Sequence, residues 1–152
     1  MLQNTETEKS PVGFAFAAIF NFVFMLVLNA HAVWRPWLHG VVTASFVDVL
    51  WAANLGFVVQ IFGNLVLSVT SPRPLRRVMD LIFASAALVG AVVFYRVFPF
   101  DLARFGEPVV VTARVLLALG VFGSAVAIMV SLVRLLASAF GGGTRPHTPV
   151  HP

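Results

Sequence analysis

The chain has 152 residues, of which 59% are hydrophobic and 11% charged, and its formal net charge is +4 at pH 7. Soluble domains carry about 25% charged residues, so this composition excludes an ordinary soluble domain and predicts a protein that lies mostly in lipid. There is no cysteine, which also excludes disulfides, thiolate nucleophiles and cysteine-based metal sites.

Residues 12–140 contain four apolar stretches, and each is long enough for a membrane-spanning helix, which needs about 20 residues. The predicted spans are about 12–33, 45–69, 79–98 and 108–139. They predict an all-α fold, an integral membrane four-helix bundle with antiparallel, up-down spans and short loops. A cytoplasmic N-terminal segment, residues 1–11, precedes the bundle. A tail rich in Gly, Pro and Thr, residues 141–152, follows it and is predicted to be disordered.

Helix-start and helix-stop residues mark the ends of these spans. Ser10 is an N-cap residue and Pro11 suits the first helical position, so the first span starts there. The segment 34–37, with two tryptophans suited to the lipid–water interface, ends the first span. Residues 101–106 predict one capped helical turn between the third and fourth spans.

The distribution of basic residues predicts the orientation of the chain, because cytoplasmic loops carry an excess of Lys and Arg. One side, which holds both chain ends and the loop between the second and third spans, has Lys9, Arg73, Arg76, Arg77, Arg134 and Arg145. The other side has Arg35, Arg96, Arg104 and Arg114. Both termini are therefore predicted to be cytoplasmic. Nearly all basic residues are Arg, which favours a GC-rich bacterial genome and hence a bacterial inner membrane.

The first span has a second interpretation. Ala30-His31-Ala32 has the small-x-small form of a signal-peptidase site after an apolar run. The acidic Glu6 and Glu8 in the leading segment and the length of the run argue against a signal peptide. Cleavage would leave three spans.

Small residues line the fourth span at helical spacing, which is typical of close helix packing in lipid. This predicted packing seam consists of Ala113, Gly120, Ser124, Ala127 and Ser131. It fits a neighbour within the bundle or a second copy of the chain. Gly123 and Ala127 form a further pair of small residues at the same spacing. The second span groups Ala53, Gly56, Gln60, Gly63 and Asn64 on one arc and Asn54 on another, so we expect it to be the most enclosed helix.

Among the charged residues inside the predicted spans, where ionisable groups are costly, Asp48 and Arg114 are the main candidates for a functional role. The helices that contain Asp48 and Arg114 begin on the same side of the membrane, and both residues lie one to two turns from the helix start, at matching depth. An intramembrane pair between them would neutralise both charges. The alternatives are a capping box from Ser45 to Asp48 and snorkelling of Arg114 to the interface. Asp80 follows Arg76 by four residues and Arg77 by three, which is ordinary pairing on a helix surface.

Four amides in the first two spans form the second group of polar candidates. Asn21 and Asn54 each lie about nine residues from their own helix start, so antiparallel neighbours would let them hydrogen-bond near the bilayer midplane. Gln60 and Asn64 share one face, where they make interhelical contacts or line a polar path.

No catalytic motif, metal-ligand pattern or cofactor motif stands out, so we expect no cofactor and no metal. The function predicted is that of a non-enzymatic interaction or accessory subunit of a membrane complex. Its expected partners are the lipid bilayer and another membrane protein or a second copy of the chain, not nucleic acid. The alternative is a small oligomeric transporter or channel that uses the polar face of the second span. A membrane enzyme would have to use outer-face groups: Asp48, Arg96, Asp101 and Glu107.

Overall fold

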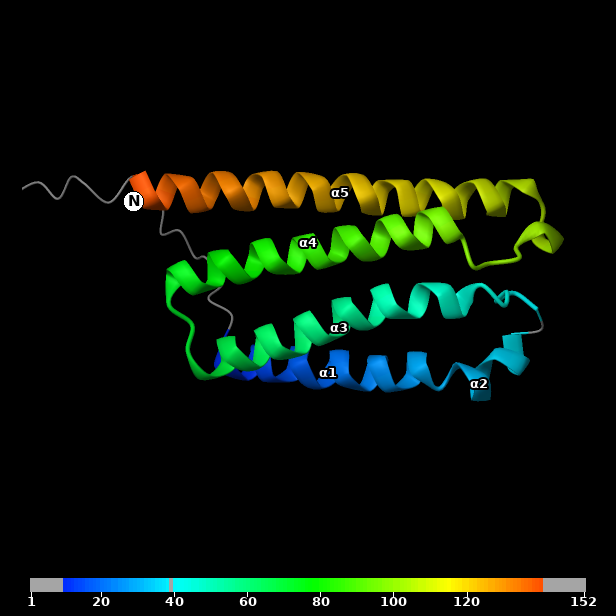
Figure 1. Ribbon diagram of the computed structural model, residues 1–152, viewed down its shortest axis with the longest axis horizontal. Helices are drawn as coiled ribbons and strands as arrows, with labels where there is room; N and C mark the ends of the chain where they lie inside the picture. The colour runs from blue at the N-terminus through cyan, green and yellow to red at the C-terminus, as the bar shows by residue number, and fades with distance from the viewer. Residues whose placement is uncertain (1–9, 39, 141–152) are drawn as a thin grey trace, which may run out of the picture.

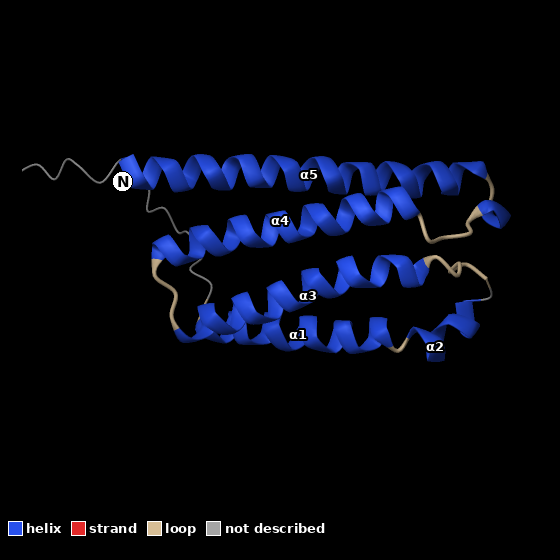
Figure 2. Ribbon diagram, viewed as in Figure 1, coloured by secondary structure: helices blue, strands red, loops and turns tan. Residues whose placement is uncertain are grey.

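The structure is a computed structural model that describes residues 10–38 and 40–140. Most of this part is helical, with short loops between the helices (Figures 1 and 2). Its elements are α1 (Pro11–Asn29), α2 (His31–Trp34), the 3-10 turn η1 (Arg35–Leu38), α3 (Phe46–Val69), α4 (Arg73–Val97), the 3-10 turn η2 (Ala103–Phe105) and α5 (Glu107–Phe140). The tail that the sequence predicts to be disordered lies outside the described residues.

Four of these helices, α1, α3, α4 and α5, are long and apolar enough to cross a membrane, in agreement with the four long apolar stretches of the sequence. A helix rises 1.5 Å per residue, so the 24 residues of α3 extend about 36 Å. The hydrocarbon core of a bilayer is about 30 Å thick. Large apolar side chains cover the outside of the molecule, such as Phe16, Phe62 and Phe122, each more than 60% exposed. This surface is suited to lipid and unsuited to water.

The four long helices lie in the order of the sequence, and the backbone of each approaches only those of its neighbours in that order. The Arg76 side chain of α4 also reaches the Phe14 ring of α1. α3 packs against α1 and α4, and α4 packs against α5. Within the described residues α1 and α5 do not contact one another, so the helical bundle is open along one side. Figure 1 shows α1 and α5 at opposite edges, with connections that alternate between the two ends of the molecule. Lipid tails are as apolar as the side chains, so no hydrophobic effect forces the bundle to close.

The second span is the most enclosed helix, as the sequence predicts. α3 buries 22% of its span, against 11% for α1, 6% for α4 and 0% for α5. Its buried residues are Phe46, Val49, Ala52, Gly63, Asn64 and Leu67. α3 is the most enclosed helix because it packs against α1 on one side and α4 on the other.

The observed helix ends agree with the sequence at three places and differ at two. The Ser10 side chain accepts a hydrogen bond from the Gly13 backbone N–H at 3.3 Å, so the predicted N-cap is confirmed. η2 forms the predicted turn, and α5 begins at Glu107 as expected. In contrast, α1 ends at Asn29, four residues before the predicted end of its span. α4 begins at Arg73, six residues early, because proline is tolerated in the first turn of a helix.

The two loops at one end of the molecule are joined by backbone hydrogen bonds. The Thr43 N–H donates to the Pro99 carbonyl at 3.1 Å, and the Asp101 N–H donates to the Val41 carbonyl at 2.8 Å. These two hydrogen bonds flank an isolated antiparallel β-bridge between Val42 and Phe100. Below the bridge lies a core cluster of Val42, Phe46 and Val49. We call this end, marked by Val42 and Phe100, the bridge end.

The opposite end contains the α3–α4 connection, the start of α1 and the end of α5 (Figure 1). Its described basic residues include Arg73, Arg77 and Arg134, and we call it the arginine end.

Candidate functional site

Two amides join α1 to α3. The Asn29 side chain donates to Oδ1 of Asn54 at 2.6 Å, and the Asn54 side chain donates back to Oδ1 of Asn29 at 3.0 Å. The sequence identifies Asn54 as a residue that binds the first span but assigns it the wrong partner, Asn21. That amide instead donates to the Ala17 carbonyl of its own helix at 2.7 Å. Asn29 lies eight residues after Asn21, so the register of α1 on α3 differs from the prediction by about 12 Å.

The amide pair lies where α1 stops being helical. Ala30 has φ −76° and ψ 25°, which ends the regular helix, and α2 starts at the next residue. The Trp34 indole N–H donates to the Val27 carbonyl at 2.6 Å, which satisfies one of the carbonyls that a helix end leaves without a partner. The His31 ring Nδ1 lies 3.2 Å from the Asn29 carbonyl. Four polar side chains therefore meet at this junction. The sequence points to Asn54, Trp34 and His31 for separate reasons, but it does not single out Asn29 or predict that the four meet.

The junction is packed against the start of α3. The Trp34 ring meets the Phe46 ring edge-on, with centroids 5.4 Å apart and planes at 83°. The His31 ring lies 6.0 Å from the same phenyl ring. Because Phe46 is only 3% exposed, these contacts hold α2 to the buried core below the bridge.

A pocket of about 450 Å³ opens beside this junction. Its lining is both polar and apolar and consists of His31, Ala32, Arg35, Pro36, Gly40 and Val42. Arg35 is half-buried there. The pocket offers a guanidinium and an imidazole to a ligand and no carboxylate, so its lining is suited to an anion.

The buried amide of α3 is satisfied inside its own helix. Asn64 is 6% exposed, and its Nδ2 donates to the backbone carbonyl of Gln60 at 2.7 Å and to the Gln60 side chain at 3.3 Å. Beside it, Gly63 packs directly against the Phe83 ring of α4. The structure thus brings Gln60 and Asn64 together at the α3–α4 contact.

The two charged candidates are not brought together. Asp48 and Arg114 are both exposed, and their helices, α3 and α5, share no contact within the described chain. The Arg114 guanidinium instead lies over the Phe98 ring, 5.0 Å from its centroid. The capping box is also absent, because the Ser45 side chain makes no capping hydrogen bond and pairs with the Thr43 hydroxyl at 2.7 Å.

The small residues of α5 are divided between two surfaces. Ala113, Ser124 and Ser131 are half-buried, and a Cβ at Gly120 would lie 3.9 Å from the Ala91 Cβ of α4. Ala127, the fifth member of the predicted seam, is exposed. Most of the predicted seam therefore lies along the contact with α4, whereas Ala127 lies on the outer surface of α5.

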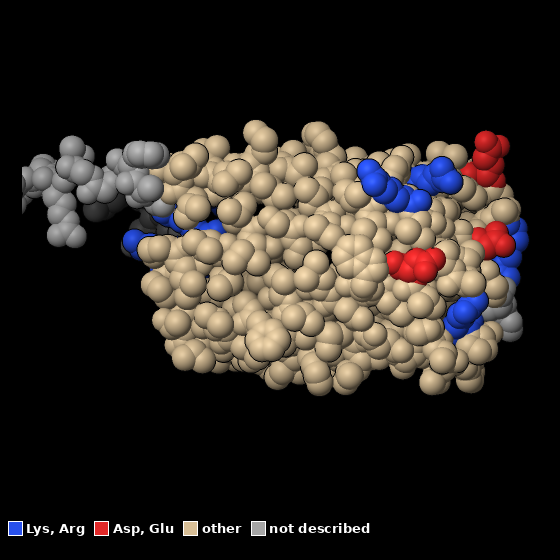
Figure 3. Space-filling view, in the orientation of Figure 1, with Lys and Arg blue, Asp and Glu red and all other residues tan. Residues whose placement is uncertain are grey.

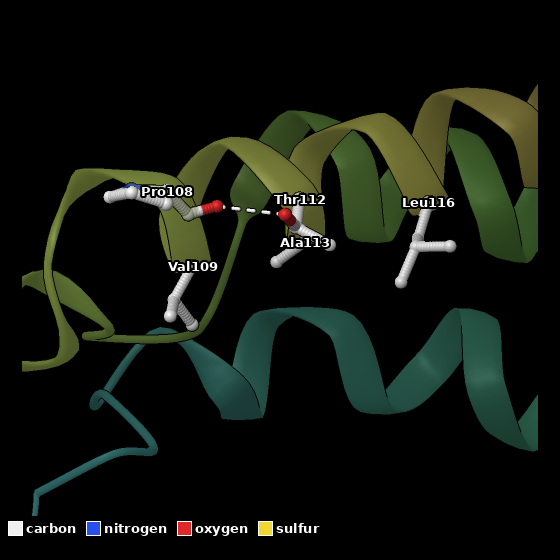
Figure 4. Close-up of a pocket in the computed structure, with 5 residues that line it drawn as sticks. All are labelled: Pro108, Val109, Thr112, Ala113 and Leu116. Carbon is white, nitrogen blue, oxygen red and sulfur yellow. Dashed lines mark hydrogen bonds between the residues drawn. The ribbon is translucent and has the colours of Figure 1, made fainter.

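A second pocket, of about 340 Å³, lies along the first turns of α5 near the bridge end. Figure 4 shows its lining residues along α5, with α3 across from them: Pro108, Val109, Thr112, Ala113 and Leu116. The Thr112 hydroxyl donates to the Pro108 carbonyl at 2.8 Å, so the lining offers a mainly apolar surface.

Charged side chains gather at the two ends of the molecule. Figure 3 shows acidic and basic groups together at the bridge end and basic groups at the arginine end, with an uncharged surface between them. Within the described ranges, no group of three or more His, Cys, Asp or Glu residues could hold a metal ion.

A scan against protein-family models finds no match, and searches of curated proteins and of solved structures also find no similar protein.

Proposed function

We propose that this chain is a multi-pass protein of the bacterial inner membrane, with antiparallel spans and both termini in the cytoplasm, and that it acts as an interaction or accessory subunit of a membrane complex. The observation that carries this proposal is the open bundle. No residue in the most apolar 18-residue window of α5 is fully buried within the chain, and one side of the row of helices has no covering helix. α5 packs along α4, and its opposite face, which no other helix of the described chain covers, is suited to receive a partner.

The positions of the arginines support insertion across a bilayer. Arg114 and Arg134 are 20 residues apart on α5, which corresponds to about 30 Å along the helix. Arg77 and Arg96 are 19 residues apart on α4, about 28 Å. Both spacings match the hydrocarbon thickness of about 30 Å. In this placement the arginines of both helices reach the two lipid–water interfaces, and the arginine end faces the cytoplasm.

The partner surface that fits best is the exposed small-residue pair of α5. Gly123 and Ala127 are spaced four residues apart and are both exposed, and a Cβ at Gly123 would meet nothing within 4 Å. Gly120, in contrast, is used against Ala91 inside the chain. In lipid, such pairs let two helix backbones approach closely, which is the main source of helix association there.

The test is purification of the tagged chain from its native membrane in mild detergent, with every co-purifying protein identified by mass spectrometry. We expect a stoichiometric partner whose recovery falls in Gly123→Leu. Ala118→Leu is the matched control, because Ala118 is exposed on the same helix about 140° away around its axis. An equal recovery of the partner with both variants would contradict the proposed surface.

A lone homo-oligomer from the same purification would favour the alternative function, a small transporter or channel. Flux into vesicles that is abolished by Gln60→Leu in a folded protein would then support transport. Unchanged flux would exclude a role for this amide.

A further inference from the structure

Arginines gather at the start of α4, where the helix itself disfavours them. Arg73, Arg76 and Arg77 lie in its first two turns, and the first turn contains no acidic residue. The N-terminus of a helix carries the equivalent of about half a positive charge, so cations there are unfavourable. The N-cap residue, Pro72, makes no side-chain hydrogen bond that would satisfy the free N–H groups. The start of α4 is therefore a strongly positive site.

A neighbouring helix adds a further arginine at the same level. Gly120 of α5 lies opposite Ala91 of α4. Arg134 is 14 residues from Gly120, and Arg77 is 14 residues from Ala91, both toward the arginine end. Arg77 also follows the heptad spacing of Ala84 and Ala91, which places it on the α5-facing stripe, where it is half-buried. The two guanidinium-bearing residues therefore approach the same interface from adjacent helices.

Within the described residues, no carboxylate forms an ion pair with Arg73, Arg77 or Arg134. Asp80 is exposed and forms no ion pair with any described residue, so the predicted pairing with Arg76 or Arg77 is not formed. The Arg76 side chain donates to the Ser71 hydroxyl at 2.9 Å and lies over the Phe14 ring. Within residues 10–38 and 40–140, Arg73, Arg77 and Arg134 form neither an ion pair nor a side-chain hydrogen bond. Arginine side chains that lie close together repel one another, and an anion bound between them would offset this repulsion.

We propose that the arginine end binds the phosphate headgroup of an anionic phospholipid at the α4–α5 boundary, with Arg73, Arg77 and Arg134 as its ligands. The guanidinium group matches phosphate oxygens in a bidentate geometry, and the free N–H groups of the α4 N-terminus add to the attraction. The site lies about 30 Å along the helices from the arginines of the bridge end, which is where the phosphates of one leaflet lie. The inference rests on the proposed insertion in a bilayer.

The experiment uses the full chain in nanodiscs of phosphatidylcholine with a minority of phosphatidylglycerol, followed by native mass spectrometry of the lipids that the released protein retains. We expect wild type to be enriched in phosphatidylglycerol. Each arginine at a membrane surface contributes about fivefold in affinity, so Arg77→Gln/Arg134→Gln should lower the enrichment about 25-fold. The matched control is Arg96→Gln/Arg114→Gln, which removes the same charges from the same two helices at the bridge end.

The outcomes separate the site from a general charge effect and from a soluble ligand. Loss of enrichment in the arginine-end variant alone supports the proposal. No enrichment in wild type, or equal loss in both variants, overturns it. Added inorganic phosphate that removes the lipid from wild type also overturns it, because the site would then prefer a free anion. If the glutamine variant does not fold, Arg77→Lys/Arg134→Lys keeps both charges but loses the bidentate geometry, and full enrichment in that variant contradicts the assigned ligands.

Failure of insertion is measured separately, by resistance of the chain to alkaline carbonate extraction from membranes. A chain that is extracted would refute the membrane proposal itself. A chain that resists extraction without lipid selectivity refutes only the headgroup site.

Discussion

Replacement of Gly63 by alanine tests how closely α3 and α4 approach one another. A Cβ at this position would overlap the edge of the Phe83 ring and lie 3.5 Å from the Met79 sulfur. Gly63 is buried, so the new methyl group has no open space to enter. The ring has to move, or the two helices have to separate.

Two opposing terms set the size of the effect. Alanine is a better helix former than glycine by about 1 kcal/mol, which stabilises the variant. Inserting a methyl group into a packed contact costs about 1–3 kcal/mol. The contact lies in the most enclosed helix, so we expect the packing cost to exceed the gain and Gly63→Ala to lose up to about 2 kcal/mol of unfolding free energy.

The matched control is Gly56→Ala on the same helix. A Cβ at Gly56 would meet nothing within 4 Å, so only the helix-propensity term applies and the variant should be as stable as wild type or more stable. Reversible unfolding in mixed micelles, followed by circular dichroism, measures both variants. In the double variant Gly63→Ala/Phe83→Leu the cost of the alanine should shrink, because the ring is gone. If Gly63→Ala is as stable as Gly56→Ala, the close contact between α3 and α4 is refuted.

Three further predictions concern the bridge end. Asn54→Leu should cost about 1 kcal/mol, and a double-mutant cycle with Asn29→Leu in the same unfolding assay should show coupling of about 0.6–1.7 kcal/mol; additive effects would contradict the amide pair. Trp34→Phe removes the donor to an end carbonyl of α1 at a cost of about 1 kcal/mol, and hydrogen exchange in the last turn of α1 should accelerate; unchanged exchange would refute the indole cap. The hydrogen bonds around the bridge make Val42 and Phe100 a non-hydrogen-bonded pair with Cα atoms about 4.5 Å apart, within disulfide range. Val42→Cys/Phe100→Cys should therefore form an intramolecular disulfide, seen as a mobility difference between oxidised and reduced samples, whereas free thiols after oxidation would contradict the bridge.

Local chemistry explains which features could be predicted from the sequence. The N-cap at Ser10, the turn at residues 101–106 and the start of α5 depend on neighbouring residues only, and the structure confirms them. The number of spans follows from the length of apolar runs, which a bilayer of fixed thickness constrains. The enclosure of α3 follows from polar and small residues on more than one face of the helix, which are unsuited to lipid.

The sequence could not predict where neighbouring helices meet. Asn54 was identifiable as a polar residue that needs a partner in lipid, but the choice of Asn29 over Asn21 depends on how far α1 is displaced along α3. That displacement is coupled to the end of α1 at Asn29 and to the Trp34 side chain that caps it, and neither is visible in a run of apolar residues.

The same limit applies to Asp48 and Arg114. Their matching depths follow from helix length, but depth says nothing about which helices are adjacent. The open row places α4 between α3 and α5 and leaves the two residues on helices that do not touch. Hydropathy, caps and proline positions thus determine the number of helices, where they start and approximately how long they are. These properties depend on local bonds and on the thickness of the bilayer. Register, adjacency and the bridge between the two loops depend on side-chain contacts between distant segments, and only the tertiary structure decides these.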